Sequence, residues 1–152
     1  MEDETEFINY MICALIEDLR ENNEDIETEM KKVGHILGRS LLELLEFHRE
    51  IDIQSLLYKI TYILLDKLHP TSRKLEASTE CKNEFFIYEY EPMYSKHVSL
   101  PDDWKDFCPE SIICGVIEYA LLASGFISVV DGYVRPTEKY PDTVVYHIKI
   151  NK

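Results

Sequence analysis

The sequence predicts an α+β fold: a helical layer packed on an antiparallel sheet of about four strands. Apolar residues recur at helical spacing over residues 8–69, whereas short aromatic and β-branched runs separated by turn-rich segments follow from residue 84. A chain of 152 residues is long enough for one core. We therefore expect a single domain over 1–152, with a helical part over 1–69 and a strand-rich part over 84–152.

The first predicted helix is amphipathic and strongly acidic. Ile8, Met11 and Leu15 recur at helical spacing, and the segment ENNED ends the helix. Acidic residues crowd residues 1–30, where Arg20 is the only basic side chain, so much of the net charge of −13 lies there. This pattern is typical of a solvated helix face, with a docking face for a basic partner as the alternative. Nucleic-acid binding is disfavoured because no cluster of Lys and Arg is present.

A second, longer helix is predicted from Ile26 to about Arg49, and it crosses two glycines. Gly34 and Gly38 each weaken a helix by about 1 kcal/mol relative to alanine, so another interaction must offset them. Both lie on one face, where the missing Cβ atoms let another helix approach closely. Close helix packing is therefore the preferred interpretation over a phosphate-binding loop, since no strand precedes the GHILG segment.

A third helix is predicted to start after Asp52, a suitable N-cap, and to end at Pro70. Its buried stripe begins with Ile53, Leu56 and Leu57. The polar, aperiodic segment TSRKLEASTECKN, residues 71–83, is expected to be a partly ordered loop.

The strand-rich part begins with Phe85–Glu91, which is aromatic and β-branched, and continues in a second strand at Lys96–Leu100 and a surface loop at Pro101–Phe107. A helix follows with Pro109 in its first turn. It is apolar on nearly all sides, with Ser111 and Glu118 as a thin polar stripe, so we expect it to be buried.

Gly125 supplies a left-handed end to this helix. Two further strands, Ile127–Val134 and Thr143–Ile150, are joined by the turn-rich segment PTEKYPD and should pair as a hairpin.

No catalytic, cofactor-binding or metal-binding motif is visible. HExxH, CxxC, GxSxG and P-loop spacings are missing from the sequence, and the five residues between Cys108 and Cys114 fall outside the usual zinc spacings. The opening MEDETEF lacks the features of a signal peptide, so a reducing compartment without disulfides is expected. Cys108 at a helix start could form a reactive thiolate, but simple packing is the preferred interpretation. No apolar run approaches the roughly 20 residues that span a bilayer.

Several motifs in order resemble one family. The segments VGHILGRSLLELL, FFIYEYEPMYSKHVSLP, ICGVIEYALLASGF and TVVYHIKI together are similar to the small subunits of the transport protein particle (TRAPP), which share the Bet-three fold. The subunit-five branch, the thirty-one-kilodalton subunit in yeast, is the most similar. The motif residues with expected structural roles are Gly34, Gly38, Glu91, Pro92, Pro101, Gly115, Glu118, Gly125 and Phe126.

The resemblance implies a non-catalytic building block without a cofactor. Family members pair through their first two helices in a complex that tethers vesicles between endoplasmic reticulum and Golgi and promotes nucleotide exchange on a Rab-type GTPase. We thus expect a Bet-three-type partner, a cytoplasmic location peripheral to those membranes, and a homodimer if the chain is isolated. The residues expected at the partner interface are Phe7, Ile8, Met11, Leu15, Leu37, Leu41 and Leu45.

One feature of the family is missing. Its best-known member carries an acylated cysteine just after the second helix, but the equivalent segment EFHREIDIQSLLYK has no cysteine. Acylation is therefore not implied for this chain. Similar folds in prokaryotic sensor domains bind small apolar ligands, so a ligand-binding domain with a cavity beneath the second and third helices is the alternative hypothesis. A thiol enzyme using Cys108 or Cys114 is a third.

Overall fold

The structure is a computed structural model that describes residues 14–15, 17–18, 25–44, 52–92 and 110–151. The helices come first, and two pairs of strands separated by one helix follow, largely as expected. In chain order the elements are α2 (Ile26–Leu44), α3 (Ile53–Lys59), the π-helical segment η1 (Ile60–Leu64), α4 (Leu65–Leu68), β1 (Arg73–Ala77), β2 (Glu84–Glu89), α5 (Ser111–Ala123), β3 (Ile127–Val134) and β4 (Val144–Asn151).

The four strands form one sheet in the order β1-β2-β4-β3, and every neighbouring pair is antiparallel. Strand β2 shows the alternation that this arrangement requires, because Phe85, Ile87 and Glu89 are buried while the residues between them are half-exposed. The β3–β4 pairing confirms the predicted hairpin, with Val130 opposite Ile148 near its middle.

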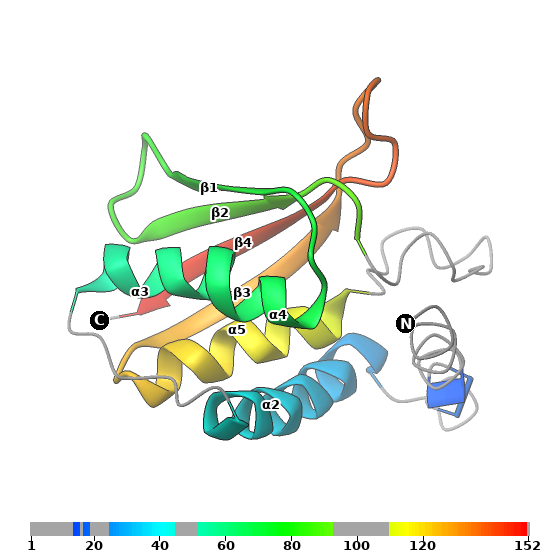
Figure 1. Ribbon diagram of the computed structural model, residues 1–152, viewed down its shortest axis with the longest axis vertical. Coiled ribbons are helices and arrows are strands. Elements are labelled where there is room, and N and C mark those ends of the chain that lie inside the picture. The colour runs from blue at the N-terminus through cyan, green and yellow to red at the C-terminus, as the bar shows by residue number, and fades with distance from the viewer. Residues whose placement is uncertain (1–13, 16, 19–24, 45–51, 93–109, 152) are drawn as a thin grey trace.

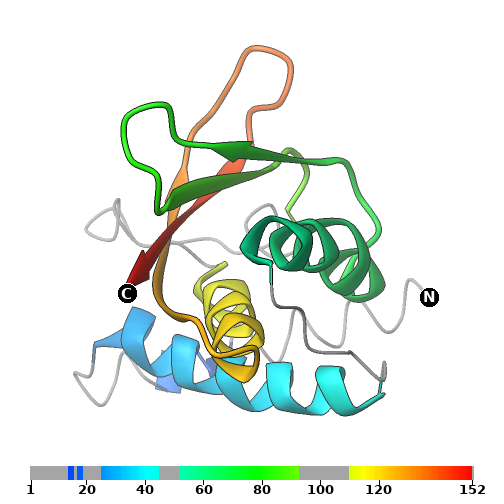
Figure 2. The same cartoon turned by 90° about the vertical axis from the view of Figure 1, so that its left-hand side faces the viewer.

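The helices gather on one face of the sheet (Figure 1). Figure 2 shows α5 lying between the sheet and α2, so that α2 is the layer farthest from the strands. Helix α5 is buried along almost its whole length, as its apolar sequence predicts. The α+β fold class is confirmed. The fully buried core combines residues from α2, α3, η1, α5 and the sheet, including Met30, Leu56, Ile60, Ile87, Ile117, Leu121, Tyr146 and Ile148.

The third helix is continuous from residue 53 to residue 68 but changes its winding. Asp52 caps it, since its carboxylate accepts a hydrogen bond from the Ser55 N–H at 3.1 Å, which confirms the predicted N-cap. The middle turn is a π-helix, in which the buried Thr61 hydroxyl donates to the Leu57 carbonyl at 2.7 Å. The helix ends at Leu68, just before Pro70.

The prediction of a loop over residues 71–83 was wrong in part, because Arg73–Ala77 form the edge strand β1. Strand β1 has few apolar residues. The charge of its buried Arg73 side chain is neutralised by Glu89, which lies directly opposite on β2. Its outward N–H at Leu75 donates to the hydroxyl of Tyr62 at 3.1 Å. Glu89 and Tyr62 both lie outside residues 71–83, so the sequence of this segment alone is typical of a loop.

Other boundaries shift slightly or fall where the structure gives no description. Strand β2 starts one residue before the predicted Phe85 and ends at Glu89, and β4 runs from Val144 to Asn151. The predicted strand Lys96–Leu100, the loop Pro101–Phe107 and Pro109 lie outside the described residues, as does the predicted helix end at Arg49. Among the helices that are described, none has the length and hydropathy needed to cross a bilayer.

Candidate functional site

Helix α2 packs against α5 through glycines. A Cβ on Gly34 would meet the carbonyl oxygen of Ile112 and would lie 2.8 Å from the Cα of Gly115. A Cβ on Gly115 would likewise meet the carbonyl oxygen of Lys31, and one on Gly38 would lie 3.2 Å from the Tyr119 Cβ. The close helix approach predicted from Gly34 and Gly38 is thus confirmed, and α5 is the helix that approaches.

The other side of α2 carries apolar side chains in contact with solvent. Val33 is 37% exposed, Ile36 is 70% exposed and Leu44 is 79% exposed. We call these three residues the outer stripe. Leaving three large aliphatic side chains in water costs free energy that burial against another surface would recover. The outer stripe is therefore the part of α2 that is suited to binding a partner.

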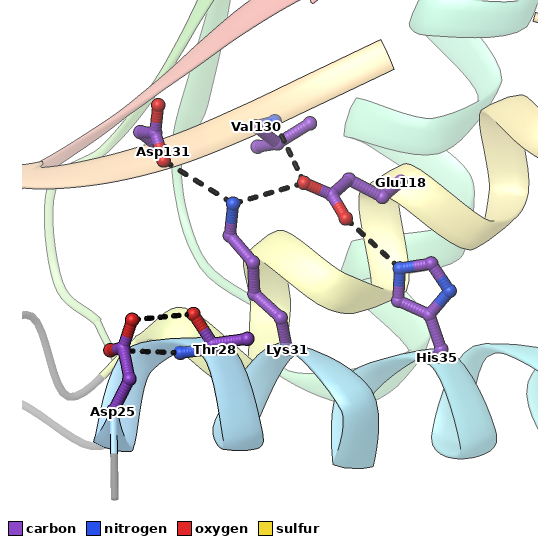
Figure 3. A network of polar contacts seen from close by, with 7 residues as sticks. All are labelled: Asp25, Thr28, Lys31, His35, Glu118, Val130 and Asp131. Carbon is purple, nitrogen blue, oxygen red and sulfur yellow. Dashed lines mark hydrogen bonds and ion pairs between the residues drawn. The ribbon is translucent and has the colours of Figure 1, made fainter. Parts of the chain in front are cut away.

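A polar network on the opposite side of α2 joins three elements around one carboxylate (Figure 3). Glu118 of α5 is 15% exposed and accepts three hydrogen bonds. Its Oε1 accepts from Lys31 Nζ at 3.0 Å and from the Val130 N–H of β3 at 2.9 Å, and its Oε2 accepts from His35 Nε2 at 2.9 Å. We call Glu118 and these three donors the Glu118 anchor.

The charge of Lys31 is well matched to its surroundings. Partial burial acts to lower the pKa of Lys31, but the hydrogen bond and charge of Glu118, together with the charge of Asp131 at 3.2 Å, more than offset it and raise the pKa above its ordinary value. The ammonium group is therefore fully charged at neutral pH. It links α2 to both α5 and β3.

The start of α2 is also fixed locally. Asp25 precedes the helix, and its carboxylate accepts from the Thr28 hydroxyl at 2.8 Å and, more weakly, from the Thr28 N–H at 3.5 Å (Figure 3). Such a cap satisfies one of the free N–H groups of the first turn.

The residues expected at the partner interface fall into two groups. Phe7, Ile8, Met11 and Leu45 lie outside the described residues. Leu15, Leu37 and Leu41 are half-buried and pack against the core.

The outer stripe was not singled out from the sequence. Lys31 and His35 were missed as well. Their spacing of one turn on the glycine-bearing face, facing the single acid of an apolar helix, is the signal that could have found them.

The family-motif residues beyond α2 and α5 lie at element ends. The exposed Glu91 offers its backbone carbonyl to His69 Nε2 at 3.1 Å, and Pro92 beside it is buried. Gly125 has φ of 91°, a left-handed conformation that side chains disfavour, and it ends α5 as predicted. Phe126 is half-buried against the core. Pro101 lies outside the described residues.

The thiol groups do not form a reactive site in the part of the chain that is described. Cys114 is fully buried within α5, so a substrate cannot reach it, and Cys108 lies outside the described residues. Cys81 is exposed, but the negative charge and hydrogen bond of Glu84 raise the pKa of its thiol, which disfavours the thiolate. Within the described ranges, no three His, Cys, Asp or Glu side chains gather as metal ligands.

A half-open cleft of about 310 Å³ lies at one end of the sheet. Its lining includes the apolar side chains of Phe85, Phe126 and Ile150 together with Lys82. Among the helices that the structure describes, α3 alone contributes to the lining, through Ile53. The cleft is therefore not the cavity beneath the second and third helices that the alternative hypothesis requires.

Residues 6–151 match the family described as "Transport protein particle (TRAPP) component". The chain is 36% identical over 143 residues to the "Putative trafficking protein particle complex subunit TRS31" of Encephalitozoon cuniculi, with 94% of this chain and 98% of that protein covered. It is 27% identical to "Trafficking protein particle complex subunit 5" of Dictyostelium discoideum, covering 84% of this chain and 72% of that one.

Solved structures share the fold at low identity. A subunit 3 of the same kind of complex from Naegleria fowleri, solved covalently bound to palmitic acid, has a TM-score of 0.82 at 16% identity and covers 100% of this chain and 98% of that one. An H-NOX protein from S. oneidensis in its Fe(II)NO ligation state has a TM-score of 0.57 at 13% identity, covering 93% and 74%. The chain belongs to the TRAPP component family. Both relatives named above are similar to it along most of its length, in agreement with the resemblance to the subunit-five branch.

Proposed function

We propose that this chain is a non-catalytic structural subunit of a TRAPP-type vesicle-tethering complex in transport from endoplasmic reticulum to Golgi. The observation that carries this proposal is the outer stripe of α2, an apolar surface left in water on a helix that is firmly attached on its other side. The membership of this chain in the TRAPP component family supports the same role.

The proposed partner is a Bet-three-type subunit, bound through the first two helices. Obligate interfaces resemble a domain core cut in two, so they are apolar at their centre. Val33, Ile36 and Leu44 fit that description. We add these three residues to the interface proposed from the sequence: Phe7, Ile8, Met11, Leu15, Leu37, Leu41 and Leu45.

The contribution to nucleotide exchange is indirect in this proposal. Other subunits bind the Rab-type GTPase, and this chain holds those subunits in position. It would reside in the cytoplasm and reach Golgi and endoplasmic reticulum membranes only through the assembled complex. The burial of Cys114 supports a role without catalysis, because it removes one candidate nucleophile from contact with substrates.

Co-expression tests the pairing. The chain and a Bet-three-type subunit from the same organism should elute as one heterodimer in size-exclusion chromatography with light scattering. Ile36→Glu and Leu44→Glu should each abolish it, because a buried unpaired carboxylate opposes association by several kcal/mol. These positions test the surface more cleanly than Leu15, whose side chain also packs on the core.

A matched control is available on another surface. Tyr58 of α3 is 59% exposed, so Tyr58→Glu introduces the same charge at a similar exposure away from α2. It should leave the heterodimer intact. A wild-type chain that stays monodisperse and monomeric beside every such subunit would contradict the proposal.

The ligand-binding alternative has a separate test. Native mass spectrometry of the purified chain would reveal a retained small molecule as added mass. The cleft at the end of the sheet is where we would then place it, because Phe85, Phe126 and Ile150 line it.

A further inference from the structure

We propose that Glu118 is a positioning residue for partner binding: it sets the rotation and depth of α2 and thereby places the outer stripe, without touching the partner itself. This inference rests on the proposed function. It concerns the polar contacts that hold α2 against the rest of the molecule.

The contact between Gly34 and Gly115 sets the distance between α2 and α5 but does little to set the rotation of α2 about its own axis. Gly34 and Gly115 meet through backbone atoms, and they offer no side chains that could interlock. Met30, Leu37 and Leu41 also pack α2 on the core, but apolar contacts have no preferred direction and resist a small rotation less than hydrogen bonds do. The Glu118 anchor supplies direction, because its carboxylate accepts from two donors on α2 and one on β3.

The two donors lie on the correct side of the helix for this role. At about 100° per residue, Lys31 and His35 project from the side of α2 opposite to Val33 and Leu44. They are one turn apart, so they constrain rotation and translation together. A rotation of α2 by about 20° would move a side chain on the outer stripe by about 2 Å, given a helix radius of about 5–6 Å. Functional groups need to be held to within about 0.5 Å and 10–20°.

The backbone contact gives the anchor a fixed reference. The Val130 N–H belongs to β3, which is paired along its length with β4, so its position is set by the sheet. Glu118 thus positions α2 relative to the sheet as well as relative to α5. Asp131, next along β3, accepts from the same Lys31 ammonium at 3.2 Å and strengthens the link to the sheet.

The test replaces Glu118 by an isosteric amide. Glu118→Gln keeps the volume but removes the negative charge, and its NH₂ group faces a donor that formerly met a carboxylate oxygen. We expect the dissociation constant for the Bet-three-type subunit, measured by isothermal titration calorimetry at neutral pH, to rise by about tenfold or more. Lys31→Met, which keeps the aliphatic stem, should weaken binding in the same direction. The double variant should be less than additive, because both changes break one link.

Glu84→Gln is the matched control. Glu84 also stands beside a histidine and a lysine, at 3.6 Å from His147 Nε2 and 4.0 Å from Lys149 Nζ, but it lies on β2 away from α2. The affinity of the Glu84→Gln variant for the Bet-three-type subunit should equal that of the wild type. Urea unfolding establishes that every variant compared is folded at the assay temperature, which separates positioning from loss of stability.

The outcomes are distinct. A wild-type chain that does not bind refutes the proposed function and this inference with it. A wild-type chain that binds, with Glu118→Gln and Lys31→Met both folded and within twofold of its affinity, refutes the positioning role alone. If Glu118→Gln does not fold, Lys31→Met and His35→Leu decide, since neither new side chain can donate to Glu118, and unchanged binding by both would overturn the inference.

Discussion

A deeply buried ion pair joins strands β1 and β2. Arg73 Nε donates to Glu89 Oε2 at 2.7 Å, and both side chains are 3% exposed. The remaining groups are satisfied as well, because Arg73 Nη2 donates to the His69 carbonyl at 2.7 Å and the Tyr146 hydroxyl donates to Glu89 Oε1 at 3.1 Å. Removing one partner from such a pair leaves an uncompensated buried charge.

Arg73→Met should therefore lower the free energy of unfolding by about 3–5 kcal/mol in urea titrations. Lys74→Met on the same strand breaks the exposed pair with Glu76 and should change the stability far less than Arg73→Met does. Equal losses in the two variants would show that the Arg73–Glu89 pair does not stabilise β1.

Lys31 predicts a pH dependence. Its pKa is higher in the folded chain than the ordinary 10.5, so the stability that it contributes is complete below that pH and is lost as the pH rises through the higher folded value. The difference in unfolding free energy between wild type and Lys31→Met should consequently shrink in alkaline solution. Tyrosines that titrate there do so in both proteins, so the difference isolates Lys31. A difference that grows above pH 10.5 would contradict the assigned contacts.

At the scale of elements, the α2–α5 crossing depends on glycine to different degrees along its length. The Cβ of an alanine at position 34 would collide with the Ile112 carbonyl oxygen and crowd the Gly115 Cα, and backbone atoms cannot move aside as a side chain can. At Gly38 the nearest atom is the Cβ of Tyr119 at 3.2 Å, a contact that a small shift relieves.

Gly34→Ala should thus destabilise the fold by about 1–3 kcal/mol or more, because overpacking exceeds the gain of about 1 kcal/mol in helix propensity. Gly38→Ala is the internal control and should change stability by no more than about 1 kcal/mol. Thermal unfolding followed by circular dichroism compares them. Two variants of equal stability would mean that the helices cross farther apart than described.

At the scale of the whole molecule, charge and exposed apolar surface oppose one another. The net charge of −13 keeps isolated chains apart at neutral pH, whereas the outer stripe favours association. The balance shifts as the pH approaches the isoelectric point of about 4.7, where the net charge vanishes.

Self-association of the isolated chain, followed by dynamic light scattering, should therefore increase between pH 7 and the isoelectric point. A variant that combines Ile36→Glu and Leu44→Glu should associate less than wild type at any given net charge, since it lacks two of the most exposed aliphatic side chains. Identical scattering from the two proteins over the whole range would mean that another surface drives association.

The sequence by itself determined the order and type of most elements, since those follow from periodicity and local chemistry. Asp52 as a helix cap, Gly125 as a helix end, the buried α5 and the β3–β4 hairpin could all be predicted from residues near one another in the chain. The two glycines of α2 even indicated a close helix contact, although the sequence did not identify the helix that makes it.

Only the tertiary structure decided what depends on distant partners. Arg73 of β1 pairs with Glu89 of β2, and Glu118 joins α2 to the sheet through Lys31 and Val130, which lie on either side of it in the sequence. The outer stripe likewise depends on tertiary packing, because Leu37 and Leu41 pack against the core while Ile36 stays exposed. Burial and ion pairing arise between segments brought together by folding, so no local pattern can specify them.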